Sequence, residues 1–158
     1  MAERNKFDVS LVTPEGAAFE GEAEMVVVPG AAGEIGVLAR HAPLVATLKA
    51  GSTRVYLNID SDDVREFATG PGFFKVELDR AIALVDDAVG ADSIDAARAQ
   101  EQLEAARAEL ERVDAGESQA DRWQLEQRII HAENQMAVAG GADFRTARAK
   151  VSAGERRT

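Results

Sequence analysis

The spacing of the hydrophobic residues changes once along this chain of 158 residues, at Gly90, and this change constrains the fold more than any other feature. Before Gly90, apolar and polar residues alternate, for example within residues 7–11 and 55–59. Alternation with a period of two is typical of strands that bury one face. After Gly90 the apolar residues recur every three or four positions, which is typical of amphipathic helices. The sequence therefore predicts a β part followed by an α part.

The apolar runs of the first part are short and are separated by glycine and proline. The run at residues 26–28, for example, ends at Pro29-Gly30. Many short strands between such turns favour an antiparallel sandwich or barrel. We therefore expect eight to ten strands before residue 90 and no helix within residues 53–85. The alternation places five side chains inside the sandwich: Val9, Val27, Leu57, Val76 and Leu84.

Two helical stripes follow Gly90 and predict an antiparallel hairpin. The first stripe consists of Ala96, Ala99, Leu103, Ala106, Leu110 and Val113. The second stripe consists of Leu125, Ile129, Ala132, Met136 and Ala139, beside a second apolar row of Trp123, Ile130 and Ala137. Because the first stripe is rich in alanine, the two helices can approach each other closely.

Short polar residues and glycines set the expected ends of both helices. Asp92 or Ser93 can cap the first helix, and Ser118 with Asp121 can cap the second. Their side-chain oxygens accept hydrogen bonds from the free amides of the first turn. The expected ends are Ala115-Gly116 and Gly140-Gly141.

The predicted fold class is therefore mainly β plus α. An N-terminal antiparallel β-sandwich over residues 1–90 precedes a C-terminal antiparallel helical hairpin over residues 91–140. Residues 141–158 have few large apolar groups and an excess of arginine and lysine, so we expect a basic, loosely ordered tail. Narrow apolar faces do not stabilise isolated helices in water, so we expect the hairpin to pack on the sandwich or on a partner.

The composition excludes several classes of function. The formal net charge of −10 repels nucleic-acid phosphates, so we expect no nucleic-acid partner. The chain has no cysteine, which excludes disulfides and thiolate metal sites. The two histidines, His41 and His131, are too few and too far apart for a metal cluster. The charged N-terminus does not resemble a signal or transit peptide, and no apolar run approaches about 20 residues, so we expect no direct membrane insertion.

No group of residues indicates catalysis. His41 can transfer protons near neutral pH, but no nucleophile or oxyanion donor accompanies it, so a hydrogen-bonding role is the simpler interpretation. The carboxylate pairs Asp62-Asp63 and Asp86-Asp87 are interpreted as solvated turns. The segment Gly70-Pro71-Gly72 lacks the phosphate-loop pattern and is also interpreted as a turn. We predict a protein that is not an enzyme, with no catalytic residue, metal or cofactor.

The segment from Pro29 to Val45, PGAAGEIGVLARHAPLV, is the most distinctive part of the chain. Its glycines permit positive φ angles, and Pro43 holds the residue before it in an extended conformation. A loop with a carboxylate, an arginine and a histidine either binds a partner or only turns a corner. The motifs G-E-I-G and H-A-P-L resemble those of the epsilon subunits of bacterial F-type ATP synthases, which are homologous to the mitochondrial delta subunit. Residues 69–73 and 94–99 are also similar to segments of that family.

The resemblance implies a central-stalk subunit that links the gamma shaft to the membrane rotor ring of c subunits. It implies a peripheral location on the cytoplasmic side of the bacterial inner membrane, and a hairpin that reaches the catalytic alpha and beta subunits and can restrain ATP hydrolysis. Glu34 matches the family's acidic residue near the polar loops of the ring, and His41 matches a histidine at the gamma contact. Arg40 lies beside His41 in the same motif, so all three are predicted partner contacts.

The resemblance also raises the possibility of ATP as a weak regulatory ligand. Asp95 and Arg98 match the family motif that forms part of a nucleotide site in those members that bind ATP. The alternative from the residues themselves is an ion pair three positions apart in the first turn of a surface helix. Members that bind ATP also use basic residues on the second helix. Arg122 and Arg128, the candidates here, are six positions apart and therefore poorly aligned on one face.

Two further interpretations stay open. In the first, the chain is an ATP-sensing β-sandwich module whose hairpin folds when nucleotide binds. In the second, it is a freestanding β-sandwich binding module with a coiled-coil dimerisation tail. The second explains the composition equally well but leaves the two motifs unexplained.

Overall fold

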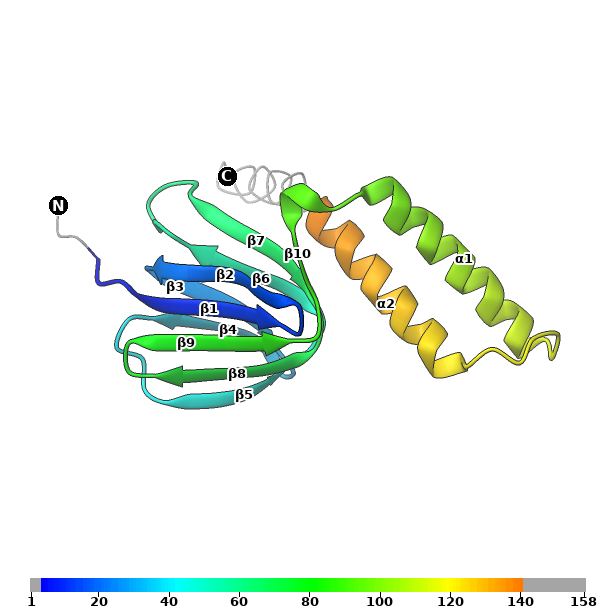
Figure 1. Ribbon diagram of the computed structural model, residues 1–158, viewed down its shortest axis with the longest axis horizontal. Coiled ribbons are helices and arrows are strands. Elements are labelled where there is room, and N and C mark those ends of the chain that lie inside the picture. The colour runs from blue at the N-terminus through cyan, green and yellow to red at the C-terminus, as the bar shows by residue number, and fades with distance from the viewer. Residues whose placement is uncertain (1–3, 141–158) are drawn as a thin grey trace, which may run out of the picture. The chain divides into compact units, whose positions relative to one another are not determined.

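The computed structural model describes residues 4–140, which fall into two compact units that divide between Ser93 and Ile94 (Figure 1). The first unit is built of strands and the second of helices. Between residues 4 and 140, no helix is both long enough and apolar enough to cross a membrane.

Ten strands form the first unit in the described part of the chain. They are β1 (Phe7–Thr13), β2 (Gly16–Ala23), β3 (Met25–Gly30), β4 (Gly33–Leu38), β5 (Leu44–Leu48), β6 (Gly51–Tyr56), β7 (Val64–Thr69), β8 (Gly72–Glu77), β9 (Arg80–Val85) and β10 (Ala88–Gly90). Their order in the sheet is β10-β7-β6-β3-β5-β8-β9-β1-β2, and β4 pairs with β3. β1 runs parallel to β9, and the other pairings of these strands are antiparallel. The predicted sandwich of eight to ten strands is confirmed.

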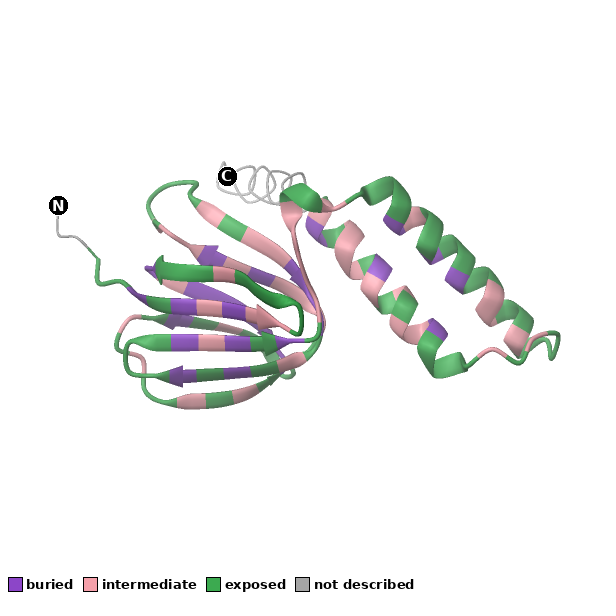
Figure 2. Ribbon diagram, viewed as in Figure 1, coloured by how far each residue is buried: buried purple, intermediate pink, exposed green. Residues whose placement is uncertain are grey.

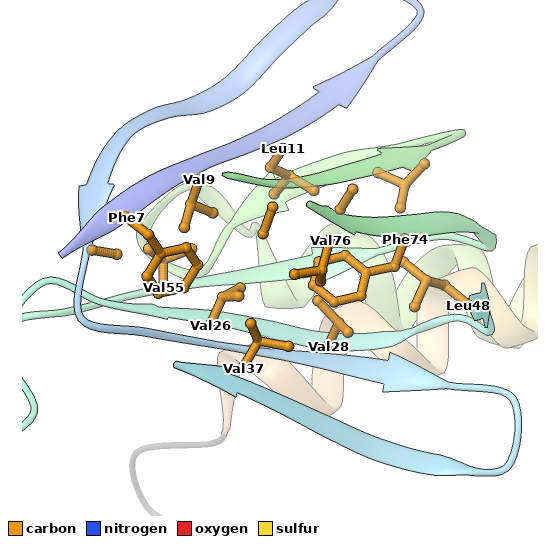
Figure 3. Close-up of a cluster of buried hydrophobic side chains, with 14 residues drawn as sticks. Phe7, Val9, Leu11, Val26, Val28, Val37, Leu48, Val55, Phe74 and Val76 are labelled. Carbon is orange, nitrogen blue, oxygen red and sulfur yellow. The ribbon is translucent and has the colours of Figure 1, made fainter. Parts of the chain in front are cut away.

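The sheet folds over on itself, so strands far apart in the sheet order share one core. In Figure 3, Val9 and Leu11 of β1 point toward Val26, Val28 and Val37 of β3 and β4. These five side chains are at most 3% exposed. Aromatic residues make up only 5% of the chain, and the core is filled mainly by valine and alanine.

The interior positions predicted from the alternation are mostly correct. Val9 and Val76 belong to the core, and Leu57 is partly buried against it. Val27 is also buried, but Val26 and Val28 on either side of it face the core, so its own side chain lies on the opposite face of β3.

The prediction for Leu84 is wrong, because its side chain is 52% exposed. β9 instead turns its small residues inward: Ala81 is paired with Val9 and Val76, and Ala83 with Leu11 and Phe74. These large neighbours already fill the space beside β9, so alanine fits there and leucine does not. The assumption that the larger hydrophobic residues of a strand face the core is therefore wrong for β9.

The second unit contains two antiparallel helices that follow a short 3₁₀ turn, η1 (Ala91–Ser93). Helix α1 spans Ala96–Asp114 and α2 spans Arg122–Ala139. Their buried residues lie on the facing sides of the pair (Figure 2): Ala99, Leu103, Ala106, Leu125, Ala132 and Val138. Five of these six belong to the predicted stripes, and the predicted helical hairpin is confirmed. Trp123 and Ile130, from the second row, are 66% and 45% exposed.

The predicted cap of α1 at Asp92 or Ser93 is wrong. These residues form η1, and the cap is Asp95, whose Oδ1 accepts a hydrogen bond from the Arg98 amide at 3.0 Å. For α2 the cap is Asp121, as predicted, with bonds from the amides of Trp123 and Gln124. The helices end at Ala115 and Gly140, also as predicted.

Candidate functional site

The distinctive segment forms the β3–β4 hairpin and the turn after it. The hairpin turns through Ala31 and Ala32, between Gly30 and Gly33, which are paired with each other. Gly33 has a φ of 142°, which a residue with a side chain rarely adopts. A Cβ on Gly30 would lie 2.6 Å from the Gly33 carbonyl oxygen, closer than atoms in contact allow. The two glycines therefore make this tight hairpin possible and place Glu34 directly after its tip.

Glu34 lies on the surface at the start of β4. Its side chain is 62% exposed, and Oε1 accepts a hydrogen bond from Nη2 of Arg54 at 2.8 Å. A shallow hollow of about 440 Å³ lies beside it, lined by the hairpin tip and by Ala46 and Thr47 of β5. An exposed carboxylate at the rim of a hollow can accept hydrogen bonds from polar groups of a partner.

Arg54 was not predicted from the sequence. It occupies a polar position in an alternating strand, β6, where an exposed arginine usually has no specific role. In the structure its side chain is only 19% exposed, and it is the residue that contacts Glu34. Arg54 and Glu34 are 20 positions apart in the chain, and nothing in the local pattern connects them.

Arg40 and His41 lie beyond the other end of β4. Arg40 is exposed and has a φ of 61°, in the left-handed region that a turn requires. His41 is partly buried, and its Nδ1 donates to the carbonyl of Ala42 at 2.6 Å. The four positions from Glu34 to Leu38, where β4 ends, already correspond to about 13 Å at 3.3 Å per residue. The three predicted contact residues therefore lie at two ends of one strand and cannot meet at one point.

A second shallow hollow, of about 340 Å³, adjoins Arg40. It is lined by the start of β1, the end of β2, the turn after β4 and the turn before β9, and its lining includes Lys6, Asp8, Glu22 and Asp79. Its polar, mixed-charge lining differs from the glycine- and alanine-rich hollow beside Glu34. The two ends of β4 thus offer surfaces of different chemistry.

The hairpin does not bring the four predicted nucleotide-binding residues together. Asp95 and Arg98 lie at the start of α1, whereas Arg122 lies at the start of α2 beside Asp114, the last residue of α1. The 16 positions from Arg98 to Asp114 correspond to about 24 Å along a helix. Arg128 lies between these ends and lines a groove of about 410 Å³ between the two helices.

The contacts of these four residues are those of a stable hairpin. The Asp95 carboxylate caps the helix through the Arg98 amide and forms no ion pair with its guanidinium among the described residues, so the ion pair considered from the sequence is not formed. Arg122 binds both Asp114 and Glu126, and the hydrogen bond that its guanidinium donates to Asp114 raises the pKa of the guanidinium. At the same end of the hairpin, Ser118 donates to Glu109, which lowers the pKa of that carboxyl.

The two carboxylate pairs that the sequence places in solvated turns lie in connections between strands. Asp62 and Asp63 are exposed in the loop between β6 and β7, and Asp86 is exposed between β9 and β10. Within residues 4–140 there is no group of three or more histidine, aspartate or glutamate side chains placed to hold a metal ion.

Comparison with known proteins gives consistent matches over most of the chain. Residues 6–91 match the β-sandwich domain of the ATP synthase delta/epsilon chain. The ATP synthase epsilon chain of Persephonella marina is 38% identical over 105 residues, which are 66% of this chain and 76% of the relative. The epsilon chain of Thermosynechococcus vestitus is 33% identical over 133 residues, which are 84% of this chain and 94% of the relative.

A solved structure of similar fold comes from the mitochondrial ATP synthase of Euglena gracilis, in a complex of OSCP, F1 and c-ring. The TM-score is 0.70 at 22% sequence identity, and the match covers 86% of this chain and 83% of the other. At this identity the match is evidence for the fold.

Proposed function

This chain belongs to the ATP synthase delta/epsilon family, and we propose that it is a non-catalytic central-stalk subunit that links the gamma shaft to the rotor ring of c subunits. The observation that carries the proposal is the extent of the matches: relatives called ATP synthase epsilon chain align over both the sandwich and the hairpin. The proposed place of work is peripheral, on the cytoplasmic side of the bacterial inner membrane.

The two ends of β4 are the proposed contact regions. Glu34, exposed at the hairpin tip, would meet the polar loops of the rotor ring, where its carboxylate accepts hydrogen bonds. Arg40 and His41, beyond the opposite end of β4, would meet the gamma subunit. This separation supports the proposal, since a linking subunit needs two distinct contact surfaces.

Charge reversal at the hairpin tip tests the ring contact. We expect Glu34→Lys to weaken capture of the rotor ring by the tagged chain at least tenfold, because a favourable polar contact becomes a repulsive one (about 1.4 kcal/mol). Glu20→Lys, the same change at an exposed position on β2, should have no effect. His41→Ala should weaken capture of the gamma subunit instead. Capture is measured by pull-down and stability by thermal melting of the isolated chain.

Two results would contradict these contacts. If Glu34→Lys and His41→Ala lower the melting temperature as much as they reduce capture, both residues are structural. If the wild-type chain captures neither the gamma subunit nor the ring, the proposed function itself is wrong.

The hairpin is proposed to restrain ATP hydrolysis by contact with the catalytic alpha and beta subunits. Arg128 is the described cation of α2 without an ion-pair partner among residues 4–140, so its charge is available to a partner. The acidic residues Glu126 and Glu133 are paired with Arg122 and Arg107 and reduce the positive charge that α2 presents. We therefore expect weaker restraint than from a strongly basic second helix.

ATP itself is expected to bind weakly. The cap occupies the Asp95 carboxylate, Arg122 is paired with two carboxylates, and Arg98 lies about 24 Å from the Arg122 end of the hairpin. Titration of the isolated chain with ATP, monitored by calorimetry, should give a dissociation constant above about 1 mM. Saturation at micromolar ATP that Arg98→Ala abolishes would contradict this expectation and favour the ATP-sensing interpretation.

A further inference from the structure

The contact between Arg54 and Glu34 crosses an entire strand. Arg54 of β6 pairs in register with Val27 of β3, and Val27 pairs with Gly36 of β4. Glu34 lies two positions before Gly36, on the same face of β4. With strands about 4.8 Å apart and about 6.7 Å for two residues along a strand, the two backbones are roughly 12 Å apart. The two side chains must therefore reach toward each other across β3 to make their contact.

The register places Val27 of β3 between Arg54 on β6 and the strand that carries Glu34. This valine is 9% exposed although it lies outside the core and on the other face of β3. Its neighbour on β4 is Gly36, where an added Cβ would lie 3.9 Å from Val27 Cγ2, so Val27 points to the same side as this position. Because Gly36 has no side chain, the aliphatic stem of Arg54 is the large group in register that can cover Val27.

In this position most of the Arg54 side chain is removed from solvent, and one of its nitrogen atoms has no hydrogen-bond partner among the described residues. Its Nε is buried and has no partner among the described residues, and its side chain is 19% exposed. A carboxylate on the adjacent strand, Glu66, is directly opposite Arg54 and accepts a hydrogen bond from Ser52 at 2.8 Å. Arg54 donates to Glu34 at 2.8 Å. Covering Val27 explains the path of the aliphatic stem, but an ion pair with a carboxylate that is 62% exposed adds little to stability, so folding does not explain the contact of the guanidinium with Glu34.

From this geometry we infer that Arg54 is a positioning residue: it fixes the carboxylate of Glu34 at the β3–β4 hairpin tip in one orientation for the partner's polar loop. Oε1 accepts from Nη2, which leaves Oε2 to accept from the partner. A rigid acceptor loses less entropy on binding than a mobile glutamate. The inference rests on the proposed function, since it names a second residue of the same contact.

The first test needs no partner. In Arg54→Met the apolar stem still covers Val27, but the guanidinium is lost. We expect the melting temperature of the isolated chain to change by no more than a few degrees, while NMR scalar couplings of the Glu34 side chain change from those of one rotamer to an average. Arg65→Met, at an exposed position on the neighbouring strand β7, is the matched control and should leave Glu34 unchanged. Unchanged Glu34 couplings in Arg54→Met would overturn the inference.

The second test measures affinity for a purified subcomplex of gamma subunit and c-ring. We expect Arg54→Met and Glu34→Gln each to weaken binding about tenfold, and the double variant to be no weaker than either, because both act through one carboxylate. Arg54→Lys, which keeps the stem and the charge, should recover part of the affinity. It replaces Arg54→Met as the test variant if Arg54→Met does not fold. Wild-type affinity in Arg54→Met, or additive losses in the double variant, would overturn the inference. If the wild-type chain does not bind, the proposed function fails, and the NMR test still decides the role of Arg54.

Discussion

Replacing Phe74 by alanine should lower the free energy of unfolding by about 3–5 kcal/mol, the usual cost of removing a buried phenylalanine. Phe74 is 1% exposed at the centre of β8. Its neighbours in register are Ala46 on β5 and Ala83 on β9, so neither of the side chains directly opposite is large enough to fill the space. The cavity should therefore persist, and the loss should fall toward the upper end of this range. Denaturant unfolding of the purified chain measures it.

Phe73 provides the matched control, since it is the preceding residue on the same strand and is 62% exposed. Phe73→Ala should change the free energy of unfolding by less than about 1 kcal/mol. Together the two variants test which face of β8 points into the core. Because Phe73 pairs with the exposed Leu84, they also test which face of β9 does so. Similar losses for both variants would mean that the assignment of these faces is wrong.

Removing the helical hairpin should raise ATP hydrolysis by the reconstituted ATP synthase about two- to tenfold. A rise of this size corresponds to an inhibited population between one half and nine tenths before removal. The chain is best cut after Ser93, because β10 pairs with β7 and the helices begin only at Ala96. The sandwich then keeps its strands and its core, and it should still assemble. Hydrolysis is measured with the wild-type and truncated chains at equal occupancy of the complex.

A single substitution tests whether the restraint on hydrolysis comes from the helical hairpin or from the residues beyond Gly140. Arg128→Ala removes the α2 cation that has no ion-pair partner in the described part of the chain, and it should give part of the rise. Arg122→Ala serves as the comparison, because Arg122 is already paired with Asp114 and Glu126. No change of hydrolysis in the truncated complex would show that the hairpin does not restrain the enzyme.

Local pattern accounts for most of the architecture. The period of two before Gly90 and the three-to-four spacing after it predicted the sandwich and the hairpin, because both patterns reflect which side chains of a single element share a face. The cap at Asp121 and the ends at Ala115 and Gly140 followed from residue types within one turn. The motifs G-E-I-G and H-A-P-L indicated the family, and the comparisons confirm it.

The tertiary structure decided the remaining points, each of which depends on residues far apart in the chain. Leu84 faces outward because β1 and β8 already fill the space beside β9. The roles of Glu34, Arg40 and His41 stay predictions, but their division between two ends of β4 is a property of the fold.

Arg54 is the clearest example of a contact that depends on residues far apart in the chain. It reaches Glu34 only because β3 holds β4 and β6 in register on its two sides. A sequence pattern reports on neighbours two to four positions apart, whereas cross-strand register is set by the packing of the whole sheet.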